Sequence, residues 1–200
     1  MAIISKGKQR IINATVDVLK EYPIDQVSMR KIAQKAGVTT GSIYHHYKNK
    51  DELLFDVMKQ TLHFTTRLYD TVKKDQHKEG QALLDEINSE VKSRLLKTEE
   101  QTLHIHFFSD VIKQKSVIKD KYQHNYKNMI DSTAELFTKA LNIRNDEYQK
   151  SMAAILVAAM DGIAMQQALD VLPEDLNKLT DVFIDFFNES IPQFLKTYKK

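Results

Sequence analysis

A run of small polar residues followed by aromatic and imidazole rings carries the chemistry that stands out in this sequence. The small residues are Thr39, Thr40, Gly41 and Ser42, and the rings are Tyr44, His45 and Tyr47. Small side chains at the start of a helix let its backbone approach base edges in a DNA major groove, and the rings can reach bases and phosphates. The pattern therefore favours DNA recognition. The alternative is that Tyr44 and Tyr47 are core aromatics of a small helical unit.

Two short helices joined by a glycine turn would have to position these residues. Apolar spacing predicts a first helix over about residues 6–21, ended by Pro23, which disfavours a helical residue before it. Ser28 is a good N-cap for a second helix, and Gly37 tolerates the positive φ of a helix end. Thr39 can cap the third. The last two would form a helix-turn-helix, whose second helix enters the major groove.

Charge is unevenly distributed along a chain that is close to neutral. Residues 1–50 hold nine Lys or Arg and three Asp or Glu, a net charge of +6, and residues 51–200 carry a net −4. Such a split indicates that the first quarter of the chain meets a polyanion and that the rest does not.

The stretch from Ile32 to Leu53 resembles the tetracycline-repressor (TetR) family of bacterial transcriptional regulators. It reads Ile-Ala-x-x-Ala-Gly-Val-x-x-Gly-x-Ile-Tyr-x-x-Tyr-x-x-Lys-x-Glu-Leu. The resemblance covers about residues 8–55, and chain length and helix count also fit the family. It implies an all-α chain of nine helices, a homodimer, a palindromic double-stranded DNA operator, and a C-terminal pocket where a small-molecule effector controls DNA affinity. Family members often have Gly after the first helix, and we interpret Pro23 as a substitute terminator.

The resemblance also implies which residues contact DNA. Phosphates would be held by Ser28, Arg30 and Lys50, with helix-terminus amides at Ser28 and Thr39. Bases would be faced by Thr40, Gly41, Tyr44 and His45. The DNA backbone would also be reached by Ser42, Tyr44 and Tyr47.

Other classes of function find little support in the sequence. There is no cysteine, so thiol catalysis and Cys-based zinc sites are excluded, and five Gly and three Pro in 200 residues disfavour a strand-and-turn fold. His45 and His46 are helix neighbours that point about 100° apart and cannot chelate together, so we expect no metal site. We also expect no enzyme signature, no cofactor, no signal peptide and no membrane span, hence a cytoplasmic protein.

Beyond residue 50, apolar residues at three- and four-residue spacing predict six longer helices. They cover about residues 53–72, 83–95, 102–112, 118–141 and 146–170, with a last helix from about 174 to the tail. We place one boundary near Asn49, which gives a helix-turn-helix domain over residues 1–49 and a helical ligand-binding and dimerisation domain over residues 50–200.

Mixed Tyr, Phe, Met and His side chains on these helices indicate a pocket for a fairly apolar effector. The candidates are Met58, Leu62, Thr65, Tyr69, Ile87, Val91, His104, Phe107, Phe108, Val111, Tyr122, Tyr126, Met129 and Met152. No Arg or Lys lies clearly among them, which disfavours a strongly anionic ligand. The alternative is that each one is an ordinary core residue, and His104 a hydrogen-bonded core histidine.

The last two helices have the composition of an interface. Small residues on the first and a wide apolar band on the second exceed what one buried stripe needs. The predicted contacts are Ala158, Gly162, Met165, Leu169, Val182, Phe183, Phe186 and Phe187. We expect these helices to pair with their copies in a four-helix, two-fold symmetric dimer. The alternative is that they only complete the core of one chain.

Together these observations predict a ligand-responsive, sequence-specific DNA-binding regulator. We expect a repressor that a small effector releases from its operator, although an activator would have the same sequence features. The alternative class is a helical small-molecule-binding protein or an enzyme with a degenerate N-terminus that does not bind DNA.

Overall fold

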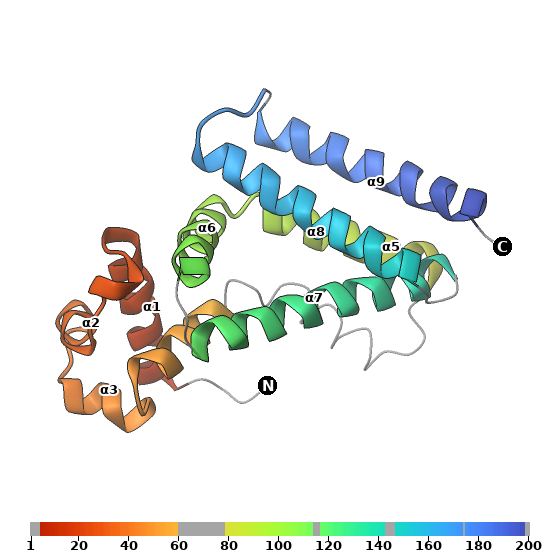
Figure 1. The fold of residues 1–200 in the computed structure, drawn as a ribbon. Helices are drawn as coiled ribbons and strands as arrows, with labels where there is room; N and C mark the ends of the chain where they lie inside the picture. The colour runs from red at the N-terminus through yellow and green to blue at the C-terminus, as the bar shows by residue number, and fades with distance from the viewer. Residues whose placement is uncertain (1–4, 60–78, 114–116, 143–146, 174, 199–200) are drawn as a thin grey trace. The chain divides into compact units, whose positions relative to one another are not determined.

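The computed structural model describes residues 5–59, 79–113, 117–142, 147–173 and 175–198. Every regular element in these residues is a helix, which confirms the predicted all-α class (Figure 1). The elements are α1 (Lys6–Glu21), the 3-10 turn η1 (Ile24–Gln26), α2 (Met29–Ala36), α3 (Thr40–His46), α5 (Gly80–Leu95), α6 (Thr98–Lys113), α7 (Val117–Leu141), α8 (Glu147–Ala168) and α9 (Leu176–Tyr198). A further helix covers residues 50–59. The predicted pocket residues Leu62, Thr65 and Tyr69 lie outside the described residues.

Local signals in the sequence explain where the first three helices begin and end. The Ser28 hydroxyl accepts a hydrogen bond from the Lys31 N–H at 3.2 Å and caps α2. Gly37 ends α2 with φ +62°, and a Cβ there would also lie 2.8 Å from the Arg10 guanidinium. Thr39 caps α3 in the same way as Ser28 caps α2. The predicted helix-turn-helix is therefore present in α2 and α3.

The chain packs as two compact units. Met1–Thr61 and Leu103–His124 form the first, called here the N-terminal unit, and Leu62–Thr102 and Asn125–Lys200 form the second, the C-terminal unit. Most of α6 and the start of α7 thus pack with α1, α2 and α3, which the linear order of the sequence does not reveal. The predicted boundary near Asn49 divides the sequence into a DNA-binding part and a ligand-binding part, and it stays a prediction.

The core of the N-terminal unit is mainly aliphatic, with buried aromatic rings at Tyr47, Phe107 and Tyr122. Its most deeply buried side chains include Ile11, Ile12, Ile24, Ile32, Ile43, Leu53, Leu54 and Met58. Within this unit, the turn η1 is held from two sides: the Asp110 carboxylate of α6 accepts the Ile24 N–H at 2.9 Å, and the Lys50 ammonium donates to the carbonyls of Ile24 at 3.0 Å and Val27 at 3.1 Å. The orientation of α2 is thereby tied to residues on two other helices.

The core of the C-terminal unit is formed by apolar faces of α5, α7, α8 and α9. Its buried residues are Leu83, Ile87, Val91, Leu95, Leu136, Phe137, Ala140, Leu156, Met160, Phe183 and Ile191. One described helix, Tyr148–Ala168, is long and apolar enough by composition to cross a membrane, and 28% of its most apolar window is buried in the chain. This differs from the expectation that no segment would reach that length. A helix in the core of a soluble protein can have the same length and apolar composition.

A buried ionic network interrupts that core. The Arg94 guanidinium, on a side chain only 7% exposed, lies 2.9 Å from the Asp161 carboxylate and 3.9 Å from the Met129 sulfur. The Tyr126 hydroxyl donates to the other oxygen of Asp161. Burial raises the pKa of the Asp161 carboxyl, and the Arg94 charge offsets this only in part. The network joins α5, α7 and α8 through the hydrogen bonds of Arg94, Tyr126 and Asp161, and the buried charges of Arg94 and Asp161 compensate each other.

We therefore expect Arg94→Leu or Asp161→Leu alone to lower the free energy of unfolding by about 3–5 kcal/mol, because each leaves an unpaired buried charge. The double variant should cost at least about 2 kcal/mol less than the sum of the two. Urea unfolding followed by circular dichroism measures both values. The exposed Lys92–Asp181 pair, with atoms 2.6 Å apart, is the matched control and should show a coupling of about 1 kcal/mol or less. Additive effects at Arg94 and Asp161 would contradict the network.

Candidate nucleic-acid interface

Helix α3 presents a thin polar face to solvent. Thr40, Gly41, Ser42, Tyr44 and His45 are all exposed, with Tyr44 at 55%, whereas Ile43 is fully buried and anchors the helix from below. No other described residue binds the Tyr44 hydroxyl. The surface predicted to face bases is therefore free to meet a partner, and the prediction that these residues contact DNA stands untested.

Neither packing nor backbone conformation requires a glycine at position 41. A Cβ at this position would meet only the Thr39 hydroxyl, at 3.7 Å, which is an ordinary contact. Its φ is not in the left-handed region either. The missing side chain therefore opens space in front of α3 and not inside the fold, as close approach to an external surface requires.

Two hydroxyls predicted to contact DNA also hold the start of α3. The Thr39 hydroxyl accepts the Ser42 N–H at 3.1 Å and lies 3.0 Å from the Ser42 hydroxyl. The Thr39 hydroxyl thus caps the helix, and both side chains remain exposed. Capping fixes the direction in which α3 presents its other residues.

The structure contradicts the surface role predicted for Tyr47. Its side chain is 2% exposed at the end of α3, and its hydroxyl is buried near the Asp56 carboxylate. Burial, with the nearby Asp56 carboxylate as a second cause, raises the pKa of the Tyr47 phenol. The Lys8 ammonium lies 5.0 Å from the ring centroid. The core alternative is correct for Tyr47 and wrong for Tyr44.

Lys50 has partners within the protein. Its half-buried ammonium donates to the carbonyls of Ile24 and Val27, and its predicted contact with a phosphate stays a prediction. The sequence pattern identified a required lysine, but spacing alone could not show that its partner is a carbonyl 23 residues earlier. The structure leaves Arg30 and Lys48 exposed, and in the described residues neither forms an ion pair.

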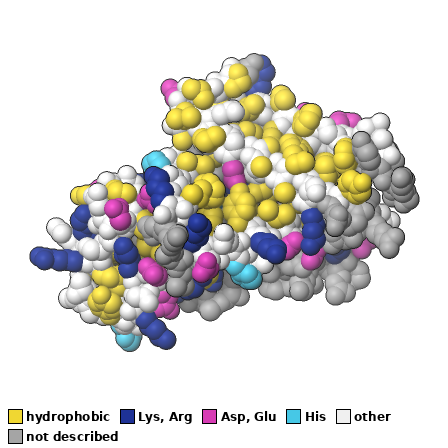
Figure 2. Space-filling model, viewed as in Figure 1, with side chains coloured by type: hydrophobic (Ala, Val, Ile, Leu, Met, Phe, Trp, Pro, Cys, Tyr) yellow, Lys and Arg dark blue, Asp and Glu magenta, His cyan; other side chains and the backbone are white. Residues whose placement is uncertain are grey.

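Other cations of the N-terminal unit already have partners. Lys8 pairs with Asp56 at 2.6 Å, Lys35 pairs with Glu21 at 2.8 Å, and the Lys31 ammonium lies 3.8 Å from the ring centroid of Tyr22. Figure 2 shows Lys and Arg side chains spread over the visible face of this unit and interleaved with acidic ones. The net charge of the first 50 residues therefore overstates the free positive charge.

The structure distributes the predicted effector residues over both units. Met58, His104, Phe107, Phe108, Val111 and Tyr122 belong to the N-terminal unit, and Ile87, Val91, Tyr126, Met129 and Met152 belong to the C-terminal unit. The buried His104 ring lies 3.3 Å from the Tyr122 hydroxyl and stacks on the Tyr122 ring at 6.0 Å. This is the hydrogen-bonded core histidine of the alternative interpretation.

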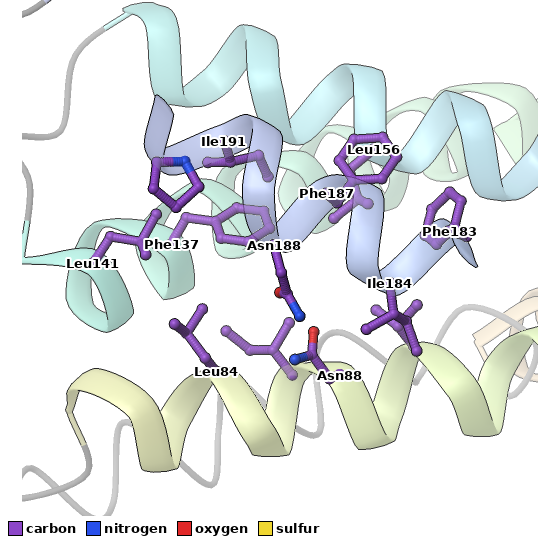
Figure 3. Close-up of a pocket in the computed structure, with 13 residues that line it drawn as sticks. Leu84, Asn88, Phe137, Leu141, Leu156, Phe183, Ile184, Phe187, Asn188 and Ile191 are labelled. Atoms are coloured by element: carbon purple, nitrogen blue, oxygen red, sulfur yellow. The ribbon is translucent and has the colours of Figure 1, made fainter. Parts of the chain in front are cut away.

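A crevice in the C-terminal unit lies between α5 and α9, with α7 and α8 behind it (Figure 3). Its lining residues are Leu84, Ile87, Asn88, Val91, Phe137, Leu141, Leu156, Phe183, Ile184, Phe187, Asn188, Ile191 and Pro192. Of the predicted effector residues in this unit that the structure describes, Ile87 and Val91 line it. Tyr126, Met129 and Met152 do not, so the predicted set does not form this site.

Most residues predicted at the dimer interface are exposed. Ala158, Met165, Leu169, Val182 and Phe186 face solvent, and a Cβ on Gly162 would meet nothing within 4 Å. Phe183 and Phe187 are corrections: Phe183 is 8% exposed, both line the crevice, and their rings lie 4.7 Å apart. Figure 2 shows hydrophobic side chains gathered over the region of α8 and α9.

The architecture is that of a helix-turn-helix protein with a helical second unit. Residues 11–57 match the model of the family described as bacterial regulatory proteins, tetR family. The chain therefore carries the N-terminal segment of the tetR family, which confirms the resemblance predicted from the sequence.

One curated relative matches part of the chain, and solved structures share its fold. The fatty acid metabolism regulator protein of Bacillus subtilis strain 168 is 38% identical over 65 residues, 32% of this chain and 34% of that protein. The match thus spans about a third of that relative. The fatty acid degradation regulator FadR from Bacillus halodurans superposes with a TM-score of 0.71 at 15% identity, over 94% of this chain and 97% of that one. A transcriptional regulator FadR from Bacillus subtilis in complex with stearoyl-CoA gives 0.62 at 19%, over 90% and 96%.

We predict that Gly41→Ala weakens binding to a specific DNA site at least tenfold, because the added methyl stands between α3 and the bases. The free energy of unfolding should stay the same or rise by up to about 1 kcal/mol, since alanine favours a helix. DNA titration by fluorescence anisotropy and thermal unfolding give the two values.

Gly7→Ala is the matched control, because its Cβ would also make an ordinary contact, 3.6 Å from the His46 ring, on a different helix. It should leave DNA affinity unchanged. An unaltered affinity in the Gly41 variant would show that α3 does not approach DNA closely.

Proposed function

We propose that this chain is a sequence-specific DNA-binding transcriptional regulator, a repressor whose operator affinity a small effector controls. The observation that carries this proposal is the open face of α3, with Gly41 bare and Tyr44 unpaired, in a segment of the tetR family. A degenerate N-terminus without DNA function would have no reason to keep that face thin. The protein would act in the cytoplasm, where its DNA lies.

The turn η1 supports a route from effector to DNA. Asp110 of α6 and Lys50 both bind this turn, which leads directly into α2. A ligand that changes the position of α6 or of the helix over residues 50–59 would change how α2 and α3 are oriented. It can do so only if it binds the two arrangements with different affinities. The first domain would then be residues 1–49 and the effector domain residues 50–200.

Relatives bear on the effector only in part. The B. subtilis FadR structure is a complex with stearoyl-CoA, but a fold shared at 19% identity does not transfer a ligand. The 38% identity to the fatty acid metabolism regulator covers only about a third of this chain. A fatty acyl effector is therefore a hypothesis to be tested beside others.

Exposed apolar residues on α8 and α9 support a homodimer. Phe186 is 61% exposed and Met165 50%, an arrangement that water disfavours and a second copy would cover. Two-fold pairing would place two α3 helices about one DNA turn apart, roughly 34–36 Å, and would require a palindromic operator.

The first test is fluorescence anisotropy on DNA from immediately upstream of the protein's own gene, at several salt concentrations and with scrambled competitor. We expect competitor-resistant binding, and Tyr44→Ala should weaken it at least tenfold while weak, salt-sensitive binding to any DNA remains. Tyr22→Ala, a partly exposed tyrosine outside the helix-turn-helix, is the control. Equal affinity of the Tyr44 variant would remove Tyr44 from the interface.

A second prediction concerns the dimer. Phe186→Glu should convert the protein to a monomer at micromolar concentration, because two buried carboxylates would face each other across a two-fold axis. Operator affinity should then fall by about a hundredfold or more, since each chain holds one half-site. Light scattering reports the mass. Asn177→Glu, an exposed change on the same helix, should leave a dimer. A monomeric wild-type protein would refute the interface.

A further inference from the structure

The crevice between α5 and α9 holds two polar side chains in an apolar setting. Asn88 of α5 and Asn188 of α9 point toward one another across it, among Leu84, Phe137 and Ile184 (Figure 3). Neither amide forms a hydrogen bond with another described residue. Asn88 is half-buried and Asn188 is exposed, so both amides are accessible and can bind a third group.

Pro192 affects a backbone carbonyl of α9 close to these amides. It lies inside α9 and lines the crevice. Proline has no N–H, so the helical hydrogen bond that residue 192 would donate to the Asn188 carbonyl cannot form. The Asn188 backbone carbonyl, on a turn of α9 whose residues line the crevice, therefore lacks its usual helical donor.

The lining also decides the charge of a ligand. None of the described residues that line the crevice is charged or titratable. A carboxylate or ammonium placed there would lose its hydration without gaining a counter-ion, which costs several kcal/mol. Amide groups and a carbonyl can instead satisfy a hydroxyl or an amide, each as donor and as acceptor.

We propose that the α5–α9 crevice is a binding site for an uncharged molecule with an apolar body and one hydrogen-bonding group, such as a phenol, an alcohol or a primary amide. The body lies among Leu84, Phe137 and Ile191, and the polar group lies between Asn88 and Asn188. Binding itself does not depend on the proposed function. Only a regulatory effect of the ligand would rest on that function.

The crevice is small in this structure, with a cavity volume of about 30 Å³, room for roughly two water-sized groups. A ring-sized ligand must therefore move α9 away from α5. Pro192 lowers the cost of that movement, because the helix beyond Asn188 is already missing one backbone hydrogen bond. The site is consequently one that ligand binding widens.

The test uses three molecules that share one body: p-cresol, toluene and 4-methylbenzoate. They are titrated at pH 7.5 into the full-length protein carrying ¹³C-labelled Ile, Leu and Val methyl groups, and the NMR shifts of Leu84, Ile87, Ile184 and Ile191 are followed. We expect saturable shifts with p-cresol, about 2- to 10-fold weaker binding of toluene because one hydrogen bond is lost, and no binding of the benzoate in the crevice.

Variants distinguish the crevice from other apolar surfaces. Asn188→Leu should reduce p-cresol affinity to that of toluene, and Asn88→Leu should have a similar effect. Asn177→Leu makes the same change on an exposed part of α9 and should alter nothing. Leu84→Trp, at the half-buried edge of the crevice, should fill it and abolish both ligands. Circular dichroism confirms that each variant is folded.

Three results would overturn the proposal. The first is p-cresol shifts confined to methyl groups outside the crevice, or absent. The second is equal affinity for all three molecules. The third is that Asn188→Leu and Asn177→Leu behave alike. The readout needs no DNA, so a failure here leaves the DNA-binding proposal intact, and a failure of operator binding leaves this experiment interpretable.

Discussion

The Lys50 ammonium is the group on which the geometry of the N-terminal unit depends. Lys50 stands at the start of the helix over residues 50–59. Its ammonium binds the carbonyls of Ile24 and Val27, in and directly after the turn that leads into α2. A charged donor in a half-buried place gains more from two carbonyls than an exposed lysine gains from water. Because Asp110 holds the N–H of the same Ile24, both polar groups of that residue are fixed. The helices that present α3 are therefore oriented by hydrogen bonds as well as by their shared apolar core.

The secondary structure could be predicted from the sequence because each boundary has a local cause. Ser28, Gly37 and Thr39 act within three or four residues of their own position, and the structure confirms each of them. The described helices α5 to α9 could equally be predicted from apolar spacing, and most of the helix predicted over residues 53–72 lies outside the described residues. The packing of α6 with the N-terminal helices could not be predicted, because no local signal connects Asp110 with Ile24 across 86 residues.

The candidate sites could be predicted less well, and for a specific reason. Residue type and spacing identify the face of a helix but not what covers it. Tyr44 and Tyr47 have the same side chain three residues apart, and one is exposed while the other is buried. Arg94 had a usable signal: it stands three residues after Val91 on the inner stripe of α5, where a charge needs a buried partner. Asp161 is that partner, and it directly follows the apolar run over residues 152–160 of α8.

One face of helix α9 lines the crevice and another face is the proposed dimer interface, so the two sites are connected. Phe183 and Phe187 turn inward and line the crevice, whereas Val182 and Phe186 turn outward, and the rings of Phe186 and Phe187 touch edge to face at 5.4 Å. A group that enters between α5 and α9 must displace the inward phenylalanines. Since all four lie within two turns of one helix, the outward ones cannot keep their positions when that happens. In the proposed dimer, a ligand in the crevice would therefore change the surface of α9 that the second copy covers.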